Sequence, residues 1–117
     1  MHKEPRDGGA DVEAVYAAGL SGYYPSPYLT PGDLKALSNR CLTGARVISN
    51  IEAYELDGGA DVARFDLSLY GEDATQKLKS WPERASDSVT FIEQLLLDVV
   101  KEKNRIMFQV WLDWDQA

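Results

Sequence analysis

The stretch from residue 45 to residue 70 reads ARVISNIEAYELDGGADVARFDLSLY. Apolar and polar side chains alternate on both sides of its central residues 57–61, and a period of two is typical of β-strands with one buried face. The two central glycines favour a turn, because glycine reaches positive φ without steric cost. The pattern therefore predicts an antiparallel hairpin with strands at 45–56 and 62–70 and a loop of about five residues.

The second strand of this hairpin alternates without interruption. The side chains expected to face the core are Ala63, Phe65, Leu67 and Leu69. Residues 105–113 alternate in the same way and predict a third strand, which could pair with either strand of the hairpin.

The longest helix is expected to begin at Ser86 or Asp87 and to end near Lys103. Its apolar residues recur at intervals of three and four, which is the spacing of one helix face. They are Val89, Ile92, Leu95, Leu96, Val99 and Val100. A shorter helix is expected from residue 73 to residue 80, ended by the following Trp81-Pro82, because the residue before a proline disfavours helix.

The N-terminal third is expected to hold a tail and two short helices. Residues 1–10 are polar and glycine-rich, and we expect them to be flexible. Asp11 can cap a helix that ends at Ala18. Thr30-Pro31 is typical of a second helix start, and that helix should end near Asn39.

These elements predict an α+β fold of two layers. A small, mainly antiparallel three-stranded sheet would pack on the one long helix, with short N-terminal helices beside it. A chain of 117 residues favours one hydrophobic core, so residues 11–117 are expected to form a single domain.

Composition excludes several classes of protein. Cys41 is the one cysteine in the sequence, so a disulfide-stapled secreted scaffold is excluded. No secretory signal is visible, and no apolar run approaches the roughly 18 residues that span a bilayer. We therefore expect a cytoplasmic protein without a membrane partner. A net charge of −7 without a basic stripe also disfavours nucleic acid as a partner.

The usual forms of histidine-based catalysis are excluded as well. The single histidine, His2, lies in the expected tail, which removes a Ser-His-Asp triad, a Cys-His dyad and a histidine-rich zinc site. Cys41 is interpreted as a small buried residue rather than a nucleophile. The sequence therefore predicts no cofactor, no metal site and no catalytic residue.

Acidic residues concentrate on the predicted hairpin and its flanks. Residues 52–73 hold seven carboxylates and one base, Arg64, for a local charge of −6, whereas the rest of the chain carries −1. Such a surface can steer a basic partner by electrostatic attraction. The same charges can instead serve solubility and protect strand edges from unwanted pairing.

The sheet face turned away from the long helix is expected to carry aromatic and acidic side chains. With the hairpin acids they form the predicted partner-binding surface, because aromatic anchors dominate interface energies. Its residues are Glu52, Tyr54, Glu55, Asp57, Asp61, Asp66, Tyr70, Trp111 and Asp113.

Three functions are compatible with this surface. The first is a small acidic protein without catalytic activity, such as an immunity protein or inhibitor, that blocks a basic toxin or nucleic-acid-processing enzyme. The second is a ligand-binding or enzymatic domain in which Glu52 and Asp66 form an acid/base pair. The third is a homodimer module that associates through Trp111 and Trp114.

Overall fold

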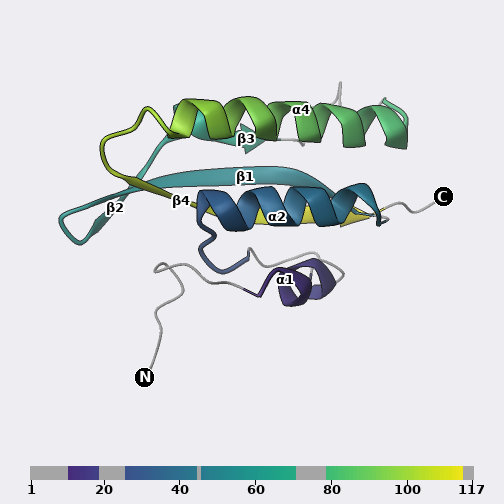
Figure 1. Cartoon of the computed structure of the whole chain (residues 1–117), viewed down its shortest axis with the longest axis horizontal. Helices are drawn as coiled ribbons and strands as arrows, with labels where there is room; N and C mark the ends of the chain where they lie inside the picture. Colours follow the sequence, from purple (N-terminus) through teal and green to yellow (C-terminus); the bar gives the residue numbers. More distant parts are fainter. Residues whose placement is uncertain (1–10, 19–25, 45, 71–78, 115–117) are drawn as a thin grey trace.

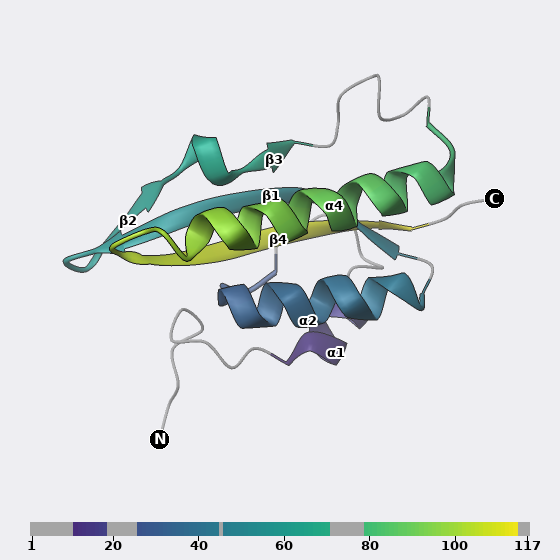
Figure 2. The ribbon, with the colours of Figure 1, turned by 45° about the horizontal axis from the view of Figure 1, so that its top comes forward.

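The computed structural model describes residues 11–18, 26–44, 46–70 and 79–114. Within them an antiparallel sheet forms one layer, and two helices on the same face form the second (Figure 1 and Figure 2). The predicted two-layer α+β fold, with a long helix packed on a small antiparallel sheet, is confirmed.

Strand β1 (Arg46–Asp57) is the centre of the sheet. Strand β4 (Arg105–Trp114) pairs with it antiparallel along nearly its full length. The short strands β2 (Ala60–Ala63) and β3 (Leu69–Tyr70) follow one another along the opposite edge of β1. The sheet is therefore three strands wide, and the C-terminal strand pairs with the first strand of the hairpin.

The hairpin turn is tighter than predicted. Asp57 pairs with Ala60, so the expected loop of about five residues is wrong and two glycines connect the strands. Their φ angles are +56° at Gly58 and +89° at Gly59. A two-residue type I′ turn needs positive φ at both central positions, and glycine adopts that conformation without strain.

The predicted strand at 62–70 is interrupted. Residues Phe65–Leu67 form a single 3₁₀ turn, η3, between β2 and β3. At this point the Ser68 hydroxyl accepts a hydrogen bond from the Ala53 amide at 3.0 Å and donates one to the Arg64 carbonyl at 2.8 Å. The Ser68 hydroxyl thus replaces a backbone carbonyl as the acceptor of the Ala53 amide. The strand pairing can therefore be interrupted for three residues while this amide keeps a hydrogen bond.

The strands on the two sides of the interruption have opposite phases, because Ala63 pairs with Tyr54 whereas Leu69 pairs with the core residue Ile51, three positions away on β1. Leu67 is buried and Leu69 is half-buried, as the alternation predicts. Phe65 is 74% exposed and Ala63 is also exposed, so the expectation that these two residues face the core is wrong.

Helix α4 (Trp81–Val99) is the long helix, and it begins and ends earlier than predicted. Its N-cap is Ser80, whose hydroxyl accepts a hydrogen bond from the Glu83 amide at 3.3 Å. Pro82 stands in the first turn, where backbone amides have no helical acceptor, so its missing N–H costs nothing there. The predicted start at Ser86 or Asp87 is therefore wrong, because Trp81-Pro82 forms the first turn of this helix.

Helix α2 (Pro31–Leu42) lies beside α4 and contacts both β1 and β4 (Figure 2). As predicted, Thr30 caps it. The Thr30 hydroxyl accepts from the Asp33 amide at 3.0 Å, and the Asp33 carboxylate accepts from the Thr30 amide at 3.2 Å. The helix extends three residues beyond the predicted end at Asn39, and it adds a second covering helix to the predicted one.

Helix α1 (Val12–Ala18) packs against α2. As predicted, the Asp11 carboxylate caps it by accepting a hydrogen bond from a first-turn amide at 3.2 Å. Its Tyr16 is buried, and two guanidinium groups lie over its ring, that of Arg40 at 4.0 Å and that of Arg46 at 4.3 Å from the ring centroid. Cation–π contacts of this kind attach α1 to the rest of the domain.

The hydrophobic core lies between the sheet and the helices. Its fully buried side chains include Leu29, Leu34, Leu37, Ile48, Ile51, Ile92, Phe108 and Val110. Leu29 also extends the sheet, because its backbone exchanges hydrogen bonds of 2.7 and 2.9 Å with Phe108 of β4. On the other side of the core, the buried Ser88 hydroxyl of α4 donates to the Ile48 carbonyl of β1 at 3.0 Å.

Two predicted segments are not tested. The tail at 1–10 and most of the helix expected at 73–80 lie outside the described residues. In the part of the chain that the structure describes, no helix is both long and apolar enough to cross a membrane.

Candidate functional site

The nine residues predicted to bind a partner do not form one continuous surface. They come from β1, β2, η3, β3 and β4, and the structure distributes them over both faces of the sheet and its two ends.

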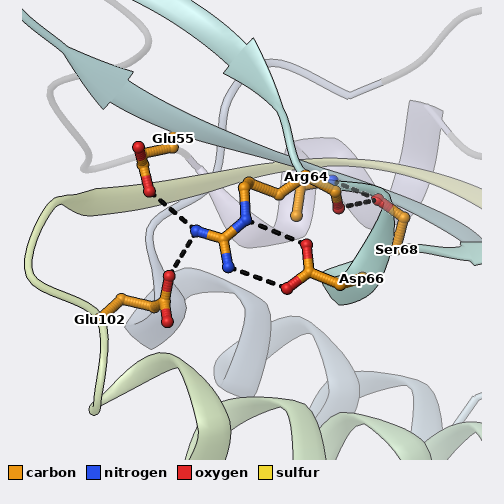
Figure 3. Close-up of polar contacts among 6 residues, drawn as sticks. Glu55, Arg64, Asp66, Ser68 and Glu102 are labelled. Atoms are coloured by element: carbon orange, nitrogen blue, oxygen red, sulfur yellow. Dashed lines mark hydrogen bonds and ion pairs between the residues drawn. The ribbon is translucent and has the colours of Figure 1, made fainter.

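One group surrounds Arg64, which links β2 to η3 (Figure 3). The guanidinium donates to Glu55 of β1 at 2.8 Å and, through Nε and Nη2, to Asp66 of η3 at 3.0 and 2.8 Å. It also donates to Glu102, which follows α4. One arginine thus joins the central strand, the 3₁₀ turn and the end of the long helix.

This cluster keeps a negative charge. One guanidinium against three carboxylates leaves −2. Hydrogen bonds from Arg64 to Asp66 and Glu102 raise the pKa of the guanidinium above its ordinary range, and the hydrogen bond from Arg64 lowers the pKa of Asp66. Arg64 and Asp66 therefore stay ionised at neutral pH, and Asp66 remains largely open to solvent.

A second group lies on the sheet face turned away from α2 and α4. The Tyr54 hydroxyl donates to the Glu52 carboxylate at 2.5 Å. The ring of Tyr28 meets that of Tyr54 edge to face with centroids 5.6 Å apart, and the Tyr28 hydroxyl donates to Asp61 of β2 at 3.0 Å. The two tyrosines therefore hold two carboxylates in defined positions.

Tyr54 also has a structural role on this face. The register places Met107 of β4 directly opposite Tyr54, and Met107 is fully buried although it points away from the main core. A small apolar contact therefore exists on this side of the sheet, and Tyr28 and Tyr54 belong to it.

Trp111 and Tyr70 lie at the other end of the same strands. Each pairs with Asn50 of β1, one from each edge. Trp111 is half-buried, and the Tyr70 side chain is not among those described. The structure therefore separates these two aromatic residues from the acidic hairpin end.

Two predicted acids belong to neither group. The Asp113 carboxylate accepts a hydrogen bond from Arg84 of α4 at 2.8 Å, which ties the end of β4 to the long helix. Asp57 is exposed beside the hairpin turn. Asp113 is thus a link within the fold, whereas Asp57 extends the acidic hairpin end.

Basic residues also lie near the hairpin and reduce the charge contrast expected from the sequence. Lys101 and Lys103 lie in the connection between α4 and β4, and Arg105 begins β4. Residues 52–66 and 98–105 together hold seven carboxylates and four bases, for a charge of −3. This end of the molecule is acidic but not uniformly so.

A cavity of about 430 Å³ opens between α4 and the β1 segment 47–49. Its polar lining includes Lys79 and Arg84, which are paired with Asp87 at 2.5 Å and with Asp113 at 2.8 Å. Both cations are therefore neutralised by carboxylates of the chain itself. The cavity also lies on the helix side of the sheet, not on the face where the sequence places a ligand site.

The structure does not assemble a carboxylate acid/base pair from Glu52 and Asp66. Glu52 lies on the face turned away from the helices, whereas Asp66 is bonded to Arg64 beside the end of α4. Cys41 is half-buried, and burial raises its pKa to about 11, so the thiol stays protonated at neutral pH. Within the described ranges, no group of three or more His, Cys, Asp or Glu side chains could hold a metal ion.

Sequence reasoning missed two residues of the hairpin end. Phe65 was assigned to the core because η3 leaves no periodic signal of its own. Tyr28 lies outside the elements predicted from the sequence, and its contact with Asp61 joins residues 33 positions apart. Neither a protein-family model, nor a curated protein, nor a solved structure matches this chain.

Proposed function

We propose that this protein binds a basic protein partner through the hairpin end of its sheet. The observation that supports the proposal is the excess of carboxylates in residues 52–66, where five acids accompany one arginine. Arg64 is bonded to Glu55, Asp66 and Glu102, and this cluster keeps a formal charge of −2. Such a surface would attract the basic side chains of a partner.

Three of these carboxylates are held in place by hydrogen bonds, which favours specific recognition of a partner in addition to electrostatic attraction. Tyr28 holds Asp61, Tyr54 holds Glu52, and Arg64 holds Asp66. Side chains that are fixed before binding lose less conformational entropy in a complex. The carboxylates are therefore suited to a partner with a matching arrangement of lysines and arginines.

The mechanism that we propose is steric blockade without catalysis. The protein would occupy the basic surface that a toxin or nucleic-acid-processing enzyme uses for its own substrate, as an immunity protein or inhibitor does. Electrostatic attraction would accelerate association, so the association rate should fall steeply as salt is added. The single cysteine supports a cytoplasmic setting for this complex.

Two charge-matched double variants test the proposal. Asp57→Asn with Asp61→Asn removes two carboxylates from the hairpin end, and Glu83→Gln with Glu93→Gln removes two exposed carboxylates from α4. Each immobilised protein is incubated with host lysate at low salt, and the captured proteins are identified by mass spectrometry. We expect the wild type and the α4 variant to retain the same basic protein and the hairpin variant to lose it.

The captured protein is then purified, and its association rate is measured over a range of salt concentrations. Equal capture by the two double variants would contradict a role for the hairpin end. An association rate that does not change with salt would contradict electrostatic steering.

A further inference from the structure

Among the described side chains, Phe65 is the one exposed aromatic residue, and 74% of it is open to solvent. We propose that Phe65 is the apolar anchor of the hairpin end and that it inserts into an apolar pocket with a basic rim on the partner protein. This inference rests on the proposed function and adds to it the residue that would carry most of the binding energy. Exposed aromatic residues at the centre of polar surroundings are typical of such anchors.

Phe65 lies in the 3₁₀ turn, where the alternation of the chain changes phase. Before the turn, Ala63 pairs with Tyr54 on the face turned away from the helices, and a regular continuation of β2 would place Phe65 on that same face. After the turn, Leu67 is buried, whereas Phe65 stays exposed. The turn is closed by the Ser68 amide, which donates to the Phe65 carbonyl at 3.3 Å. Irregularities of this kind are common next to functional sites.

The base of the turn is rigid. The Arg64 side chain is only 22% exposed and is bonded to Glu55 and Glu102 on elements that belong to the folded layers (Figure 3). Asp66 is held by the same guanidinium on the other side of Phe65 in sequence. A phenylalanine has two side-chain torsions, so presenting it from a fixed turn leaves little entropy to lose on binding.

The surroundings of Phe65 indicate the chemistry of the partner. Val62, also exposed, precedes it in β2, and Asp66 follows it with a largely exposed carboxylate. An apolar pocket would bury Phe65, and lysines or arginines at its rim would pair with the acids. A second copy of this chain fits less well, because a symmetric contact would bring the same carboxylates of the two copies together.

The test compares two exposed apolar side chains. Phe65→Ala removes the proposed anchor, and Leu97→Ala removes a similarly exposed residue of α4, which is 61% open to solvent. The probe is the basic protein that the wild type captures and that the hairpin double variant loses. We expect Phe65→Ala to raise its Kd roughly 30-fold and Leu97→Ala to leave it within about 2-fold. Circular dichroism and thermal melting should show that both variants are folded as the wild type is.

The outcomes separate this inference from the proposed function. If Phe65→Ala binds as tightly as the wild type while the hairpin double variant does not bind, the anchor is refuted and the proposed function stands. If no captured protein depends on the hairpin acids, both are refuted. If the wild type self-associates in size-exclusion chromatography with light scattering and Phe65→Ala does not, Phe65 serves a second copy and the basic partner is refuted.

Discussion

Replacing Ser68 with alanine would isolate the hydrogen bond that holds the 3₁₀ turn against the sheet. In the wild type the Ser68 hydroxyl accepts from the amide of Ala53, a residue that is 1% exposed. Its removal would leave a buried N–H without an acceptor, which costs roughly 1–3 kcal/mol. The Arg64 carbonyl would lose one donor but still accept from the Leu67 amide at 3.1 Å. We therefore expect the free energy of unfolding to fall by about 2 kcal/mol.

Urea unfolding, followed by tryptophan fluorescence, measures this change. With a slope of about 1–3 kcal/mol per molar urea, the midpoint should fall by about 1 M, and the Ala53 amide should exchange faster with deuterium. Ser68→Thr keeps the hydroxyl and should retain most of the stability, and Ser86→Ala on the exposed side of α4 should be neutral. A Ser68→Ala protein within about 0.5 kcal/mol of the wild type, with a protected Ala53 amide, would refute this account of the turn.

Three further substitutions test other parts of the fold. Gly44→Ala should lower the melting temperature by about 5 °C or more, because a Cβ at Gly44 would lie 1.7 Å from the Tyr16 hydroxyl oxygen and displace a buried ring. An unchanged melting temperature would contradict that packing. Thr30→Ala should cost about 1 kcal/mol in urea unfolding through loss of the α2 cap, whereas Thr90→Ala should not. Between pH 9 and pH 11 the free energy of unfolding should fall more in the wild type than in Cys41→Ala. The reason is that the thiol ionises with its ordinary pKa of 9.0 in the unfolded chain but with a pKa of about 11 in the folded protein. Equal pH dependence of the two proteins would contradict this.

Elements with local signals could be predicted from the sequence. The alternation at 45–56 and 105–113 corresponds to β1 and β4, and every boundary agrees within one residue. The Thr30 capping box involves residues three positions apart, and it is formed as expected. Such features depend on backbone geometry and on near neighbours, so they are visible before the tertiary structure is known.

The predicted start of α4 was wrong because the dipeptide Trp81-Pro82 has two possible structural meanings. Trp81-Pro82 can end one helix or stand in the first turn of the next, because a proline is tolerated where no amide acceptor is needed. Ser80 immediately before the pair indicates the second meaning, since its hydroxyl caps α4. Giving weight to that serine would have placed the helix start correctly.

The candidate site could not be predicted because its contacts are distant in sequence. Ser68 bonds to a residue 15 positions away, Arg64 to a residue 38 positions away, and Tyr28 to a residue 33 positions away. Each contact requires the sheet and the helices to be assembled first. Periodicity therefore indicated which residues lie on the hairpin, but not that a turn would change the phase of the alternation between Ala63 and Leu69.

Phe65, which the alternation of the sequence wrongly places in the core, is also the residue that best distinguishes a binding surface from a surface that is only soluble. Carboxylates around a hairpin turn have two explanations, because they keep a protein soluble whether or not they contact a partner. An exposed phenylalanine has the opposite effect on solubility. The chain nevertheless presents Phe65 on a turn that the Ser68 hydrogen bonds and the Arg64 ion pairs hold in place, beside acids that solubility alone would explain. A partner that combines an apolar pocket with basic residues accounts for both features, and solubility accounts for only one of them.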